Sequence, residues 1–110
     1  MDNWAVDTVG ITITSATIKS GTCGIAGYAF HYCSSLTNIA IPNSVKYIDE
    51  YAFSNCSSLT DFEIPESVIS IERGAFSGCL NLMRVYIPSS VISIGESVLS
   101  YCENIKSIKV

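Results

Sequence analysis

Charge is scarce in this sequence, and positive charge is the scarcer kind. Only 15% of the 110 residues are charged, and ten acidic residues stand against six basic ones, which gives a net charge of −4. Such a chain is a poor partner for nucleic acid phosphates. No apolar run approaches the roughly 20 residues of a membrane-spanning helix, and the start shows no secretory signal. We therefore expect neither nucleic-acid binding nor membrane insertion.

Catalytic motifs are also missing. The sequence has no glycine-rich phosphate loop, no catalytic triad motif and no metal-ligand spacing. Its single histidine, His31, lies two residues before Cys33, so if Cys33 points into a core we expect His31 on the surface. Asp61 and Glu63 alternate on one expected strand face, which is too open to shift the pKa of a carboxylate. A hydrolase or thiol enzyme using Cys23 or this acidic pair is therefore disfavoured, and we predict no enzyme, no catalytic residue and no cofactor.

Apolar residues make up 48% of the chain, and they recur with a period of 23 residues. Aligned on this period are four cysteines, four aliphatic residues three positions later, and three prolines (Cys33, Cys56, Cys79, Cys102; Leu36, Leu59, Leu82, Ile105; Pro42, Pro65, Pro88). Some nine positions stay in phase over four copies, which chance does not produce. The period divides the chain into a leader or degenerate cap at residues 1–12 and a repeat region at 13–110, made of four units and a final strand.

Each unit carries the local signals of a coil. Alternating aliphatic residues before the proline predict parallel strands at 37–41, 60–64, 83–87 and 106–110, with an earlier one near 13–18. A Val-x-x-Ile stretch then predicts a short returning strand or extended segment. The spacing of Ala52, Phe53 and Cys56 fits one turn of α- or 3₁₀-helix, and we expect such turns near 50–55, 73–78 and 96–101. Phe53 and Phe76 should stack in the core between coils.

The unit resembles the BspA-like type of leucine-rich repeat, which reads roughly LxxIxIPxxVxxIxxxAFxxCxx. The stretch from Leu36 through Pro42 to Cys56 follows this pattern without a gap, and Leu59 to Cys79 does so again. The resemblance covers residues 13–110. It implies an α/β fold, a right-handed leucine-rich-repeat solenoid with a parallel sheet on one face and short helical turns on the other.

The four cysteines on the period admit three interpretations: a disulfide framework, a metal site, or buried free thiols. Side chains stacked at one repeat position lie about 4.8 Å apart and point the same way, whereas a disulfide needs Cβ atoms about 3.8 Å apart that face each other. A metal needs ligands that converge, and stacked residues lie along a line. We therefore predict buried, unbridged thiols that reach a turn carbonyl, and no metal. Cys23 is off the period and should be more exposed.

Outward-facing strand positions vary between units, while inward ones barely change. Two columns of such positions, each made of equivalent residues from successive units, read Ser15, Asn38, Asp61, Arg84, Ser107 and Thr17, Ala40, Glu63, Tyr86, Lys109. This variation fits a recognition surface, and equally a surface that nothing constrains. We predict partner-binding residues at Asn38, Asp61, Glu63, Arg84, Tyr86 and Lys109. Arg84 and Tyr86 are the strongest candidates, because arginine and aromatic residues dominate interface energetics.

The resemblance also implies a function, since BspA-like proteins are associated with microbial surfaces and with adhesion to host proteins or other cells. Our leading hypothesis is a protein-interaction or adhesion module whose ligand is a protein. The alternative is a scaffold or spacer segment that binds nothing. The resemblance implies a cell-surface or secreted location, while reduced cysteines and the missing signal leave the cytoplasm open.

The C-terminal end carries a further expectation. The chain stops at Val110, directly after the final strand, so we expect an edge with unpaired backbone groups that Lys106 and Lys109 protect only in part. This predicts either a fragment of a longer array or self-association through the edge strand at residues 105–110.

Overall fold

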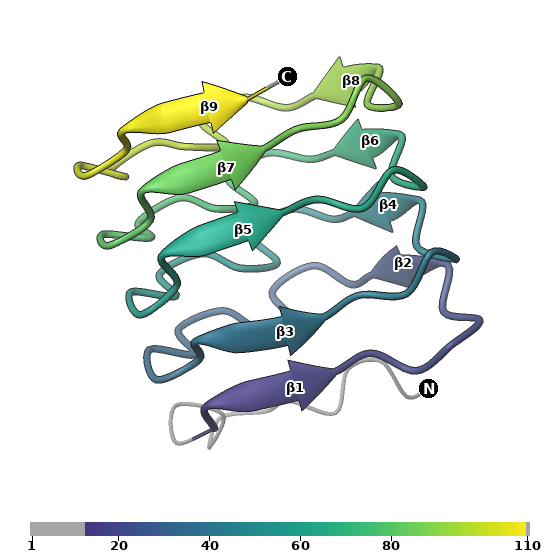
Figure 1. Cartoon of the computed structure of the whole chain (residues 1–110), viewed down its shortest axis with the longest axis horizontal. Helices are drawn as coiled ribbons and strands as arrows, with labels where there is room; N and C mark the ends of the chain where they lie inside the picture. Colours follow the sequence, from purple (N-terminus) through teal and green to yellow (C-terminus); the bar gives the residue numbers. More distant parts are fainter. Residues whose placement is uncertain (1–12, 110) are drawn as a thin grey trace.

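A computed structural model describes residues 13–109, which form a stack of coils with two parallel strands in each complete coil (Figure 1). The longer strands lie along one face and are β1 (Ser15–Thr17), β3 (Asn38–Ala40), β5 (Asp61–Glu63), β7 (Arg84–Tyr86) and β9 (Ser107–Lys109). The shorter strands lie along a second face and are β2 (Gly24–Ile25), β4 (Tyr47–Ile48), β6 (Ser70–Ile71) and β8 (Ser93–Ile94). The predicted leader at residues 1–12 lies outside the described residues.

The register of the longer strands confirms the period of 23. Asp61 pairs with Arg84 and Arg84 with Ser107, all in parallel strands. β1 and β3 pair in the same register, with Ser15 opposite Asn38. β3, β5 and β7 each have three residues and end two residues before a proline, which has no N–H to extend a ladder.

The shorter strands confirm the predicted returning segment. β2, β4, β6 and β8 form one continuous parallel sheet of four strands, and each has two residues. Ile25, Ile48 and Ile71 point inward from this sheet and are fully buried.

The predicted helical turns are wrong: within residues 13–109 this segment is a series of tight turns without a helix. Its amides alternate between two kinds of acceptor. Half donate to a carbonyl three residues back in the same coil, and half donate to the next coil (Ala75 to Glu72, Ser77 to Gly74, Cys79 to Phe76; Gly74 to Glu96, Phe76 to Val98, Gly78 to Ser100). Each coil also places two residues of the segment in the left-handed region, such as Tyr51 (φ 56°) and Asn55 (φ 60°). A right-handed helix cannot pass through such residues.

The core is a stack of equivalent side chains, as predicted. The rings of Phe30, Phe53 and Phe76 lie one above another, with centroids 5.3 and 5.4 Å apart and planes within 4° of parallel. Phe53 and Phe76 are fully buried, as are Leu36, Leu59 and Leu82 in the neighbouring column.

The strand face departs from the expected continuous parallel sheet. β1 and β3 form one sheet and β5, β7 and β9 form another, with no pairing between β3 and β5 (Figure 1). The inward position of β5 holds Phe62, where the equivalent residues are Ala16, Ile39, Val85 and Ile108. The larger ring fills more space behind the strand, and we attribute the break to it.

The last coil is the least covered part of the stack. Ile92, Ile94 and Ile108 are exposed by 83%, 53% and 48%, although Ile48 and Ile71 at the position of Ile94 are fully buried. Each inner coil is covered by the next, and among the described residues nothing covers the last one.

Candidate functional site

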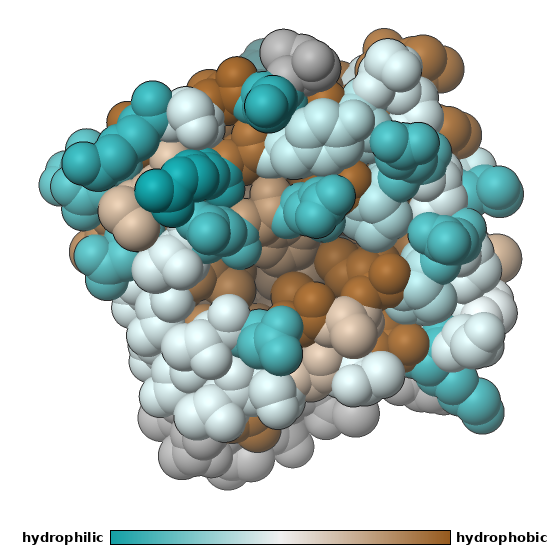
Figure 2. All heavy atoms as spheres, viewed as in Figure 1, coloured by the Kyte–Doolittle hydropathy of each residue, from teal (hydrophilic) through white to brown (hydrophobic). Residues whose placement is uncertain are grey.

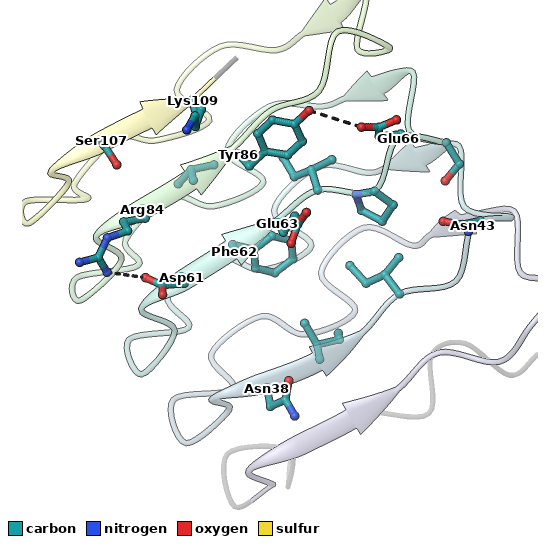
Figure 3. A pocket seen from close by; sticks show the side chains of 16 residues that line it. Asn38, Asn43, Asp61, Phe62, Glu63, Glu66, Arg84, Tyr86, Ser107 and Lys109 are labelled. Carbon is teal, nitrogen blue, oxygen red and sulfur yellow. Dashed lines mark hydrogen bonds and ion pairs between the residues drawn. The ribbon is translucent and has the colours of Figure 1, made fainter.

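The six residues predicted to bind a partner lie along one open groove on the strand face (Figure 3). Asn38 comes from β3, Asp61 and Glu63 from β5, Arg84 and Tyr86 from β7, and Lys109 from β9. The groove has a volume of about 1040 Å³. The structure therefore brings the predicted residues together, and their role in binding stays a prediction.

Two polar contacts organise the charged side of the groove. The guanidinium of Arg84 donates to the Asp61 carboxylate across 3.1 Å, with both side chains about 60% exposed. The Tyr86 hydroxyl donates to the carboxylate of Glu66 at 3.4 Å. Glu63 and Lys109 are exposed and form no ion pair with any residue that the structure describes. Their charges are therefore available to a partner.

The floor of the groove is apolar. Ile39 and Ile41 are half-buried, and Phe62 is 5% exposed. Figure 2 shows the hollow on the strand face, with hydrophobic surface at its base and hydrophilic side chains around it. This floor, and Asn43 and Glu66 on the rim, were not among the residues predicted to bind a partner. One signal could have indicated it, since Phe62 is the only aromatic residue in its column.

All five cysteines are free thiols, and three of them bond to the turn of the preceding coil. Those of Cys56, Cys79 and Cys102 donate to the carbonyl oxygens of Phe30, Phe53 and Phe76 at 3.1 to 3.2 Å, as predicted. Cys33, Cys56 and Cys79 are buried, but the prediction for Cys102 is wrong in this respect. It is only half-buried, because it belongs to the uncovered last coil.

The chemistry of the buried Cys33 and Cys56 thiols is that of a core and not of a nucleophile. Burial raises the pKa of the Cys33 thiol. Burial, followed by the charge of Cys33, raises the pKa of Cys56 to about 12. A thiol must lose its proton to attack or to bind a metal, so these groups stay inert at neutral pH. Cys23 is exposed, as predicted.

His31 does not pair with a cysteine. Its Nδ1 forms a hydrogen bond with the hydroxyl of Ser54, and its ring contacts the edges of Tyr28 and Tyr32. The ring is half-buried, so the interpretation as a plain surface histidine is only partly correct. Burial lowers the pKa of His31, which keeps the imidazole neutral at neutral pH.

Residues 13–109 contain neither a candidate metal site nor a candidate membrane-spanning helix. No cluster of three or more His, Cys, Asp or Glu side chains could hold a metal ion there. No helix in this part of the chain has the length and apolar character to cross a membrane.

Comparison with known proteins adds sequence and structural relatives. A sequence model of the BspA type leucine rich repeat region matches residues 10–110, in six copies. The solved structure of a leucine-rich repeat protein from Bacteroides ovatus is 32% identical to the chain, with a TM-score of 0.83. A leucine-rich repeat protein from T. pallidum is 28% identical, with a TM-score of 0.87. No curated protein matches the chain.

The matched structures are longer than this chain. The B. ovatus match covers 87% of this chain and 24% of that protein, and the T. pallidum match covers 91% and 47%. The chain thus spans about a quarter to a half of the length of these relatives.

Proposed function

Because this chain belongs to the BspA-type leucine-rich repeat family, we propose that it is a protein-interaction module whose ligand binds the face formed by β3, β5, β7 and β9. The observation that carries this proposal is the groove. Six outward side chains that differ between units gather there above an apolar floor. A spacer has no need of such a concentration of unlike polar groups at one place.

The groove has the composition of a protein interface. Tyr86 and Arg84 of β7 supply an aromatic and an arginine anchor, and Glu63 and Lys109 supply unpaired charges of both signs. The apolar floor provides area that a partner can bury. We assign the module to the cell surface and its role to adhesion to host proteins or other cells, in line with the family resemblance.

The test is binding to a panel of immobilised extracellular-matrix proteins, measured by surface plasmon resonance. The double variant Arg84→Ala/Tyr86→Ala should weaken any binding by tenfold or more, because each hot-spot truncation costs about 2 kcal/mol. Arg73→Ala/Tyr47→Ala is the matched control, since it removes the same two residue types away from the groove and should leave binding unchanged.

The spacer alternative makes the opposite prediction. A spacer should bind no member of the panel and should tolerate charge reversal at Asp61 and Arg84 without loss. Equal binding by the groove variant and the control variant would also contradict the proposed face.

A further inference from the structure

The strand face is open between β3 and β5. Every other pair of neighbouring strands on this face is joined by the same two backbone bonds. The N–H of the residue just before the later strand donates to the preceding coil, and the N–H of the residue just after the earlier strand donates to the following coil. Before the strands, the N–H groups of Thr37, Met83 and Lys106 donate to the carbonyl oxygens of Thr14, Thr60 and Met83, respectively. After the strands, the N–H groups of Ile18, Ile64 and Ile87 donate to the carbonyl oxygens of Ala40, Tyr86 and Lys109, respectively. Between β3 and β5, the equivalent donors are the backbone amides of Thr60 and Ile41. Neither has a partner within the part of the chain that the structure describes.

The opening is confined to this face. The same two coils remain joined by the pairing of β4 with β6, where Ile48 lies opposite Ile71. They are also joined at the turns, where Phe53 donates to Ala75 at 2.8 Å and Asn55 to Ser77 at 2.7 Å. Two closed sides and one open side make a cleft within an intact stack.

Phe62 holds the cleft open from behind. Its ring packs edge-on against Phe53 of the preceding coil, at 5.1 Å between centroids, and against Phe76 of its own coil, at 4.7 Å. A ring that reaches both coils occupies more depth than the isoleucine or valine of the equivalent positions. β5 stays paired with β7, so the separation falls on the β3 side.

The cleft presents peptide groups to a ligand. The residues that flank β3 offer the Ile41 N–H and the Thr37 carbonyl on one wall of this cleft. The other wall offers the N–H of Thr60, just before β5, and the carbonyl of Glu63. Unpaired backbone groups of two parallel strands are the template for an added strand, as in β-augmentation. Both walls carry unpaired groups, so a strand inserted between them has partners on both of its edges once β3 and β5 stand two strand spacings, about 9.6 Å, apart.

We propose that this cleft takes up an extended segment of a partner protein as an additional strand between β3 and β5. The inference rests on the proposed interaction function and names its ligand class. Side chains of the inserted strand alternate, so a central aliphatic residue faces Ile39 and Phe62, and its neighbours face outward.

The charge of Glu63 indicates the identity of one of the outward-facing residues of the inserted strand. Glu63 is exposed without an ion pair, whereas Asp61 is paired with Arg84 and Glu66 accepts from Tyr86. The outward residue beside Glu63 is therefore Lys or Arg. The ligand is an extended segment in which a basic residue adjoins a central aliphatic one.

The probe is the blocked peptide acetyl-Val-Lys-Val-Lys-Val-amide, which reads the same in both directions and places a lysine beside Glu63 in either orientation. Titration into the isotope-labelled chain is followed by NMR. In the free chain the amides of Ile41 and Thr60 should exchange with solvent at least tenfold faster than those of Ile64 and Met83. The peptide should slow exchange at both amides.

Three controls separate backbone pairing from charge. A peptide with N-methyl groups on its three central residues keeps the charge but loses the donors, and should bind at least tenfold more weakly. The variant Glu63→Gln should weaken binding up to about fivefold, as expected for an exposed charge pair. Glu103→Gln, in the last coil, should have no effect.

The variant Phe62→Ile should close the cleft, which protects Ile41 and Thr60 in the free chain and abolishes peptide binding. Protection of Ile64 and Met83 shows whether this variant is folded, and the N-methyl comparison needs no variant at all.

Four results would overturn the proposal. The first two are slow amide exchange of Ile41 and Thr60 in the free chain at low concentration, and equally tight binding of the N-methylated peptide. The third is a set of peptide-induced chemical shift changes confined to the outer edge of β9. The fourth is concentration-dependent protection of these amides without peptide, which would assign the cleft to a second copy of the chain. Failure of the matrix-protein panel is a separate outcome. It would contradict adhesion through Arg84 and Tyr86, while peptide protection of Ile41 and Thr60 would still establish strand insertion.

Discussion

At the residue scale, the aromatic stack concentrates much of the packing in a few side chains. Phe53 contacts Phe30 and Phe76 through parallel faces and Phe62 through an edge, all within about 5.4 Å between centroids. It is the member that touches every other ring of the core. Offset-stacked and edge-to-face pairs add to the effect of burial alone.

The substitution Phe53→Ala should therefore lower the free energy of unfolding by about 3–5 kcal/mol, as truncation of a large buried aromatic residue does. Chemical denaturation followed by circular dichroism measures the change. Tyr47→Ala, at a side chain exposed by 47%, is the control and should change stability by less than about 1 kcal/mol. A similar loss in both variants would show that the stack is not the main support.

The buried thiol of Cys56 makes the free energy of unfolding depend on pH. The folded pKa of Cys56 is about 12 against an ordinary value of 9.0, so the fold favours the protonated thiol. Below pH 9 both states hold the proton and nothing changes. Between pH 9 and 12 the unfolded state loses it first, so the free energy of unfolding falls as pH rises, by up to about 1.4 kcal/mol per pH unit for one thiol.

The measurement is denaturation of the wild type and of Cys56→Ala from pH 8 to pH 11. The variant should be less stable at pH 8, because it loses the bond to the Phe30 carbonyl, and its stability should fall less steeply above pH 9. Identical slopes would contradict the shifted pKa. Alkylation of the native chain at pH 8 should modify Cys23 before the buried Cys33 and Cys56, since Cys23 is exposed.

At the element scale, the distance between coils depends on a few close backbone approaches. The N–H of Gly95 donates to the Ile71 carbonyl at 2.7 Å. A Cβ atom at Gly95 would lie 2.4 Å from the Arg73 nitrogen and 2.7 Å from the Glu72 carbonyl carbon. Both are main-chain atoms of the preceding coil, so the coil itself must move to accommodate a side chain.

Gly95→Ala should accordingly cost about 1–3 kcal/mol, the usual range for overpacking. Gly24→Ala is the matched control, because its Cβ would meet Tyr47 no closer than 3.6 Å. It should leave stability within about 1 kcal/mol of the wild type. Thermal unfolding of the two variants side by side decides between them, and equal transition temperatures would refute the close approach.

At the scale of the whole molecule, the last coil of residues 13–109 is poorly covered. Ile92, Ile94 and Ile108 are exposed in the last coil, and β9 pairs with β7 on one side only. An exposed apolar edge strand is a site for pairing with another chain. We propose that the 110-residue chain self-associates through this end, in the simplest case as a symmetric dimer with two final strands antiparallel.

Sedimentation velocity over a range of concentrations tests this proposal. The wild type should shift toward a dimer at high concentration, and Ile94→Lys/Ile108→Lys should shift it back to the monomer. Leu80→Lys, at a side chain exposed by 45% outside the last coil, is the control and should behave as the wild type. A wild type that stays monomeric throughout would contradict association through the end.

The sequence by itself determined the period, the strand positions, the parallel register and the inward columns. Each of these features follows from which side chains must be buried away from water, and the apolar positions of the 23-residue repeat identify those side chains. The thiol-to-carbonyl bonds followed as well, because Cys56 and Cys79 are small polar groups at core positions. The gathering of Asp61, Arg84 and Tyr86 on one face followed from the alternation of side chains along strands.

The tertiary structure alone decided where the backbone hydrogen bonds go. The turn before each cysteine is not helical, because alternate amides such as that of Phe53 bond the next coil, and the sequence pattern places side chains without assigning amides. The break between β3 and β5 has the same origin. In the sequence Phe62 is one more inward apolar residue, but in the structure its ring packs against Phe53 and Phe76 on two different coils, a contact that the sequence pattern does not specify.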